Sequence, residues 1–254
     1  MSKRDRRRVR EHFNMRIAIV SDIHGNLTAL EAVLADLRET SPDMIFHGGD
    51  LADGGARPAE VVDRVRGLGW PGVIGNTDEM LARPETLADF VAQSPPTLQP
   101  LFAVIRENAA ATREALGEDR VAWLGSLPRA QIQEQFALVH ASPESCWRAP
   151  GPEATDAELE SVYRPLGKTF AVYAHIHRPY IRSAPGLAVA NTGSVSLSCN
   201  GDPRASYLLV DESAPRICRV EYDLAHECRI VAESRLPHAG WIAKMLECGG
   251  FVMP

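Results

Sequence analysis

Apolar residues between positions 15 and 75 alternate between short continuous runs and helical spacing. Residues 16–20 are almost wholly apolar and have the length of a buried strand, and residues 27–37 then repeat leucine and valine every three or four positions. Residues 44–46, 58–65 and 73–74 continue the order strand, helix, strand. A β-α-β-α-β order favours parallel strands with right-handed crossovers. We therefore expect an α/β fold whose ligand site lies beyond the carboxyl ends of the strands.

The pattern changes after residue 84. Residues 85–127 have helical spacing, interrupted at Pro95 and Pro96, and we interpret them as a helical insertion that covers one side of the site. A capping box at Thr155 and Glu158 predicts a further helix, and helix is expected again near the end of the chain. Strands are predicted at residues 133–139, 170–173, 187–190, 206–210 and 216–222.

Length and composition limit the domain organisation and the compartment. A chain of 254 residues with 45% hydrophobic residues can form one substantial core, so we expect a single domain over residues 15–254. The 5 cysteines are odd in number and form no Cys-x-x-Cys pair, which argues against a disulfide scaffold and a structural zinc site. No apolar run reaches the length of a membrane span. These features predict a cytoplasmic protein that does not enter a membrane.

Residues 1–14 differ in charge from the rest of the chain. They contain six of the 27 Lys and Arg residues and two of the 33 Asp and Glu residues, which leaves the remainder with a formal charge of −10. We expect a disordered basic extension, while a basic arm for nucleic acid and a true start at Met15 remain alternatives. The acidic remainder argues against a broad nucleic-acid surface, which needs clustered positive charge. An anionic substrate must then be held by a local positive centre.

Polar groups that can bind metal ions follow apolar runs at several places. The five segments are Asp22-Ile23-His24, Gly48-Gly49-Asp50, Gly75-Asn76-Thr77-Asp78, Val139-His140-Ala141 and Ala174-His175-Ile176-His177. A single histidine after a strand is more often structural, but the recurrence indicates a two-metal hydrolytic site. Carboxylate and imidazole without thiolate suit manganese, iron, zinc or nickel.

The chemistry expected of such a site is hydrolysis of a phosphate ester. Asp50 follows two glycines that permit close backbone approach, so its carboxylate can bridge two cations about 3.5–4 Å apart. Two divalent ions offset by two carboxylates leave a positive centre that attracts phosphate. Each ion also lowers the pKa of bound water, so that a hydroxide held between the ions can attack phosphorus.

The ordered set Asp22-x-His24, Gly49-Asp50, Gly75-Asn76, His140 and His175-x-His177 resembles the signature of the calcineurin-like metallophosphoesterase superfamily. The string SDIHGNL at residues 21–27 is similar to that of its small bacterial phosphoesterases. The resemblance implies a four-layer α/β/β/α sandwich with a dinuclear centre between the sheets, and catalytic roles for Asp50, Asn76 and His140. It also implies a division of the ligands: Asp22, His24 and His177 for the first ion, Asn76, His140 and His175 for the second, and Asp50 for both.

The chain departs from this family pattern at Thr77. Family members often carry a histidine there that can act as general acid, and the hydroxyl of Thr77 cannot deliver a proton near neutral pH. Asp53 resembles the acid that pairs with that histidine, so it has lost its usual partner. Because a general acid contributes about 10²–10⁴-fold in rate, we expect a preference for esters with acidic leaving groups.

Other polar residues near these segments have less certain roles. Asp53, Thr77, Asp78 and Arg178 are candidates for contact with substrate or for support of the ligands. Arg178 could bind a phosphate oxygen, although a surface salt bridge is equally consistent with its position. His47 precedes the glycine pair, and we expect a core histidine bonded to backbone there.

The sequence leaves the substrate open. The leading prediction is a phosphatase or phosphodiesterase that uses two divalent ions, with manganese the first choice, on a small phosphorylated molecule. A dinucleoside polyphosphate hydrolase and a non-catalytic interaction scaffold on the same fold are the alternatives. Nucleic acid is not expected as a partner, and a homo-oligomer is left open.

Overall fold

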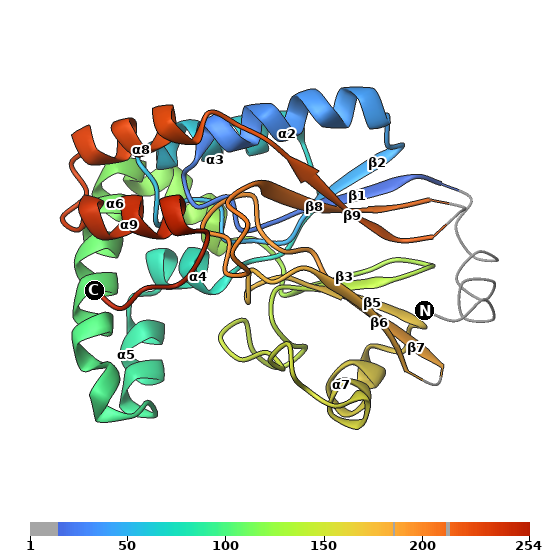
Figure 1. Ribbon diagram of the computed structural model, residues 1–254. Helices are drawn as coiled ribbons and strands as arrows, with labels where there is room; N and C mark the ends of the chain where they lie inside the picture. Colours follow the sequence, from blue (N-terminus) through green and yellow to red (C-terminus); the bar gives the residue numbers. More distant parts are fainter. Residues whose placement is uncertain (1–14, 185, 212–213) are drawn as a thin grey trace.

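Two β-sheets pack face to face and carry helices on both outer sides (Figure 1). The computed structural model describes residues 15–184, 186–211 and 214–254, so the basic extension expected at residues 1–14 lies outside the described residues. Helices α2 (Leu27–Thr40) and α3 (Pro58–Leu68) lie over one sheet, and α7 (Asp156–Tyr163) lies over the other. The expected α/β/β/α layering is confirmed.

The first sheet has four strands within the described residues, in the order β2-β1-β8-β9. β1 and β2 run parallel, with Ile17 opposite Met44, and α2 forms the crossover between them. β8 is antiparallel to β1, so the sheet is mixed. The bounds are β1 (Ile17–Val20), β2 (Met44–His47), β8 (Ala205–Val210) and β9 (Arg216–Val220).

The second sheet has five strands within the described residues, in the order β3-β4-β5-β7-β6. The three central strands β4, β5 and β7 are parallel, and β3 and β6 are antiparallel edge strands. The bounds are β3 (Ala130–Ile132), β4 (Ala137–Val139), β5 (Phe170–Tyr173), β6 (Tyr180–Ala184) and β7 (Leu187–Asn191).

Alternate residues of the buried strands belong to different cores. Ile17 and Ile19 of β1 lie in the core between the two sheets, whereas Ala18 and Val20 lie in the core beneath the helices. Because successive side chains of a strand point to opposite faces, a strand covered on both sides is apolar at every position. This explains why the sequence shows continuous apolar runs rather than alternation.

Most of the remaining helices gather on one side of the sheets (Figure 1). The segment expected to be helical at residues 85–127 forms α5, a 3-10 turn and all of α6, and helix is also found near the end of the chain. No helix in the part of the chain that the structure describes is long and apolar enough to cross a membrane. The bounds are α4 (Asn76–Ala82), α5 (Glu85–Ala92), the 3-10 turn η1 (Pro96–Leu98), α6 (Gln99–Gly125), the 3-10 turn η2 (Arg164–Leu166), α8 (Leu224–Glu233) and α9 (Ala239–Cys248).

Two strand predictions were wrong in detail, and two further strands were not predicted. Residues 73–74 form no strand, because α4 begins at Asn76 and leaves room only for an isolated bridge between His47 and Gly72. Residues 133–139 form a tight turn followed by β4, and the turn is closed by a hydrogen bond from Gln133 N to Phe136 O. The short edge strands β3 and β6, whose residues are partly exposed, were not predicted from the sequence.

Candidate metal centre

The side chains expected to bind metal lie in loops that follow the carboxyl ends of strands. Asp22 and His24 follow β1, and Asp50 follows β2. His140 follows β4 directly, and the His175 and His177 pair follows β5, so both sheets contribute. Asn76 is the first residue of α4. Strand ends far apart in the sequence thus meet at one edge of the sandwich.

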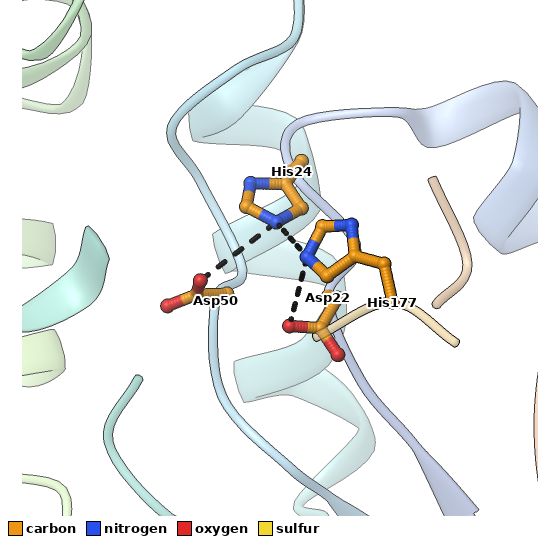
Figure 2. Close-up of side chains that lie close together, drawn as sticks. All are labelled: Asp22, His24, Asp50 and His177. Carbon is orange, nitrogen blue, oxygen red and sulfur yellow. Dashed lines mark hydrogen bonds and ion pairs between the residues drawn. The ribbon is translucent and has the colours of Figure 1, made fainter. Parts of the chain in front are cut away.

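One group of side chains is drawn in Figure 2. One potential ligand atom from each of its four members lies within 4.8 Å of the others. His24 Nε2 is 3.2 Å from His177 Nε2 and 3.7 Å from Asp50 Oδ2. His177 Nε2 is 3.3 Å from Asp22 Oδ1. The spacing and the buried oxygen and nitrogen donors fit one divalent cation.

A second group adjoins the first at Asp50. Asn76 Oδ1 lies 3.0 Å from His140 Nε2 and 2.8 Å from His175 Nδ1. His140 Nε2 is in turn 3.5 Å from Asp50 Oδ2. The same Oδ2 atom therefore lies near His24 of the first group and His140 of the second, which is the position a bridging carboxylate requires.

Backbone carbonyls orient three of the imidazole rings. The Nδ1 atoms of His24, His140 and His177 lie 2.5, 2.7 and 2.7 Å from the carbonyl oxygens of Asp53, Gly48 and Leu197. Because a carbonyl only accepts, each Nδ1 must carry the proton and donate it. The Nε2 atoms are then turned toward the carboxylates. Metal-binding histidines are commonly held in this way.

Several of these residues have a left-handed backbone that is costly for residues other than glycine. The φ angles are 54° for Asp22, 49° for His24, 55° for Asp50, 67° for His175 and 53° for His177. Such conformations cost on the order of 1 kcal/mol or more each and cluster at functional sites. The fold holds these side chains in place against local preference.

The charge balance of the site favours cations. Burial raises the pKa of Asp50, but the imidazoles of His140 and His24 lower it more, so its pKa lies well below the usual range. Burial lowers the pKa of His140, but Asp50 and Asp22 raise it to about 9. Burial also lowers the pKa of His177, but the carboxylate of Asp22 raises it more. Without metal, protons on His140 and His177 therefore provide the positive charge that the carboxylates require. Metal ions and protons should compete for this site.

Asp78 lies near the site but supports the backbone. Its carboxylate is fully buried and accepts hydrogen bonds from the N–H groups of Asp50, Leu51 and Gly75, at 2.7, 3.0 and 3.1 Å. All of these donors belong to the loops that carry Asp50 and Asn76. Asp78 thus supports the candidate ligands rather than facing a substrate.

Asp53, Thr77 and Arg178 take different positions. The carboxyl group of Asp53 accepts a hydrogen bond of 2.9 Å from Thr112 Oγ1 of α6, so α6 supplies it with a partner. Thr77 N donates to Asp50 Oδ1 at 2.9 Å, while Thr77 Oγ1 is buried and has no hydrogen-bond partner in the part of the chain that the structure describes. Arg178 is exposed.

Glu79 is a buried residue beside the site that was not predicted from the sequence. Its carboxylate accepts hydrogen bonds from the indole of Trp147 at 2.7 Å and the thiol of Cys146 at 2.9 Å, and it pairs with Arg129 at 2.6 Å. Glu79 is buried and directly follows the Asn76-Thr77-Asp78 segment. Its position next to that segment was the feature of the sequence that could have pointed to it. A single glutamate in a helix usually faces solvent, however, so this position alone did not indicate a buried role.

Comparisons with known proteins identify several that are similar to this chain. A family model described as a calcineurin-like phosphoesterase superfamily domain matches residues 15–214. An uncharacterized protein of Methanocaldococcus jannaschii is 29% identical over 257 residues, which cover 92% of this chain and 98% of that protein. The symmetrical bis(5'-nucleosyl)-tetraphosphatase of Methylococcus capsulatus is 30% identical over 151 residues, which cover 58% of this chain and 50% of that protein. The crystal structure of a metallophosphoesterase from Sphaerobacter thermophilus is similar, with a TM-score of 0.74 and 29% identity over 92% of this chain and 99% of that chain.

Proposed function

Because the chain belongs to the calcineurin-like phosphoesterase superfamily, we propose that it hydrolyses a small phosphate ester with the help of two divalent metal ions. Manganese is the first choice, and iron, zinc and nickel suit the same donors. Asp50 would contact both ions. The remaining ligands would be Asp22, His24 and His177 for one ion and Asn76, His140 and His175 for the other.

The convergence of electron-pair donors is the observation that carries this proposal. His24 and His177 each use Nδ1 to donate to a backbone carbonyl, and their Nε2 atoms approach within 3.2 Å of each other. Two unprotonated nitrogens at this distance repel unless a proton or a cation lies between them. Buried acids and imidazoles in this arrangement are costly without bound positive charge.

Two divalent ions held here would attract phosphate oxygens and lower the pKa of bound water. The residues of the chain would fix the geometry of that chemistry. The N–H of Thr77 holds Asp50 Oδ1 at 2.9 Å, and the carboxylate of Asp78 holds the backbone of the same aspartate at 2.7 Å. At the place expected for a general acid, Thr77 offers a hydroxyl, which can donate a hydrogen bond but cannot give up its proton at neutral pH.

Hydrolysis of a dinucleoside polyphosphate is the second candidate. It is supported by the similarity of part of the chain to the Methylococcus capsulatus tetraphosphatase, at 30% identity over 151 residues. Both candidate functions would use the same metal ligands. They differ in the group attached to the phosphate, which the rest of the site would have to accept.

Metal content and turnover test the proposal together. We expect about two ions per chain after reconstitution with manganese, and hydrolysis of aryl phosphodiesters in the same sample. Asp50→Asn should lose metal and most activity, while Asp89→Asn, at an exposed position of α5, should match the wild type. Failure to bind a second ion would refute the dinuclear centre. Two bound ions without hydrolysis of monoesters, diesters or polyphosphates would favour the scaffold alternative.

A further inference from the structure

A cavity of about 380 Å³ opens beside the candidate metal ligands. His24, Asn76 and His175 line it at the end nearest the metal centre, together with Thr77. Ligand pockets for small molecules begin at about 300 Å³. The cavity is therefore large enough for an organic group attached to a phosphate held at the metal centre.

The walls of the cavity come from helices beyond the strand ends (Figure 1). Phe90 of α5 and Phe102 of α6 line one side, and Ile242 and Met245 of α9 line another. α9 lies beyond residues 15–214, the part that the family model matches. This wall is therefore a feature of the chain outside the matched family domain.

The polar atoms of the aromatic walls are already occupied. Trp147 Nε1 donates to Glu79 at 2.7 Å, and Trp241 Nε1 donates to the carbonyl of Val252 at 2.7 Å. Both indoles thus offer only hydrocarbon surface to an occupant. Among the described residues, neither lysine nor arginine lines the cavity.

We propose that this cavity receives an uncharged, apolar organic group of the phosphate ester, and that it selects such esters over nucleotides. The inference rests on the proposed function for the phosphate end of the ligand. A hydrocarbon chain would replace water along the aliphatic and aromatic walls, and each buried methylene contributes about 0.8 kcal/mol. Thr77 lines the cavity. Its hydroxyl is buried and has no hydrogen-bond partner among the described residues, and rotation of the side chain toward the mouth would let it donate to the ester oxygen.

A nucleotide fits the same cavity poorly. The polar edge of a base would lose its hydrogen bonds to water, and the occupied indole N–H groups could not replace them. Asp53 and Asn108 also line the cavity, but each already accepts a hydrogen bond, from Thr112 Oγ1 at 2.9 Å and from the N–H of His238 at 3.2 Å. A polyphosphate chain would carry several negative charges past walls without cationic side chains. Both costs weigh against the dinucleoside polyphosphate alternative.

Binding of alkylphosphonates to the manganese-loaded protein tests the inference without turnover. From methylphosphonate to hexylphosphonate, we expect affinity to rise about four-fold for each added methylene. Ile105→Trp should remove this length dependence and leave the affinity for methylphosphonate unchanged, because Ile105 lines the cavity but is no candidate ligand. Ile132→Trp, at a position 51% exposed on β3, is the matched control and should behave as wild type. Ile105→Ala is a second, less disruptive variant. Because it enlarges the cavity, the increase in affinity with chain length should continue to longer alkyl chains than in the wild type.

The outcomes separate the cavity from the catalytic proposal. If phosphonates do not bind at all, 1-alkanols of increasing length report the cavity alone through quenching of tryptophan fluorescence. Length-dependent binding without hydrolysis of any ester would support the cavity and count against the proposed function. Affinity that does not change with chain length for either probe would overturn the inference, as would tighter binding of adenosine 5'-phosphate than of hexylphosphonate.

Discussion

His47 is fully buried and has no hydrogen-bond partner among the described residues, and its replacement should change how the stability of the protein depends on pH. The residue was expected in the core with a bond to backbone, but both ring nitrogens are buried, and no group in residues 15–184, 186–211 or 214–254 forms a hydrogen bond with them. The ring packs closely against Gly72, and its centroid lies 6.3 Å from that of Trp123. An uncharged imidazole is tolerated there, and a charged one is not.

The size of the effect follows from the pKa. Burial lowers the pKa of His47 from 6.5 to about 4 in the folded protein. Between these values the unfolded chain binds more protons than the folded protein, so the free energy of unfolding falls as the pH decreases. Each unit of pKa difference corresponds to about 1.36 kcal/mol. Protonation of His47 alone should therefore lower the free energy of unfolding by about 3 kcal/mol as the pH falls from 7.5 to 4.

His47→Leu removes this titration and keeps a side chain of similar size. The free energy of unfolding can be measured with urea at pH 7.5, 6.0 and 4.5, with a chelator present to exclude metal effects. Between pH 7.5 and 4.5 it should fall by about 2–3 kcal/mol more in the wild type than in the variant. His226→Leu, at an exposed position of α8, is the matched control and should follow the wild type. If wild type and His47→Leu lose stability in parallel, the ring is not held neutral by burial and the reasoning fails.

Three further substitutions test the site itself. Asp50→Asn should reduce activity more than a change at any other candidate ligand and should resist rescue by added manganese, since both ions lose the shared charge; near-normal turnover in a metal-replete sample would place the bridge elsewhere. In the wild type we expect the rate to fall steeply as the leaving-group pKa rises, and Thr77→His should flatten this dependence and raise activity on alkyl esters by about 10²-fold or more. A series of substrates graded in leaving-group pKa measures both effects, and a shallow wild-type slope would mean that another group supplies the proton. Asp78→Ala should lower the free energy of unfolding, measured by heat or urea, by about 3 kcal/mol, because three buried N–H donors lose their acceptor and each loss costs about 1 kcal/mol or more. An unchanged free energy of unfolding would show that water replaces the carboxylate.

The parts of the fold that depend on local pattern could be predicted from the sequence. β1, α2 and β2 were predicted close to their bounds because strands buried on both faces and amphipathic helices have distinct apolar spacing. The edge strand β6 was missed because its residues are partly exposed and include Arg182 and Ser183. Its position depends on pairing with β7, which no local pattern encodes.

The candidate ligands could be named from the sequence because each follows a strand in an ordered set. The supporting contacts could not, since they join residues that are remote along the chain. The hydrogen bond from Thr112 to Asp53 spans 59 positions, and that from Trp147 to Glu79 spans 68. Such contacts depend on how α6 and the loop after β4 pack over the site.

The first turn of α4 connects the metal centre with the cavity. Successive side chains of a helix point in directions about 100° apart, so neighbours in the sequence reach different surroundings. Asn76 faces His140 and His175, Thr77 lines the cavity, and Asp78 holds the Asp50 loop. Glu79 completes the turn by binding the indole of the cavity wall. Because one rigid turn positions all four contacts, a shift of the cavity wall should also move a candidate metal ligand. The organic group of a substrate, by displacing that wall, could therefore change how the phosphate of the same substrate is held at the metal centre.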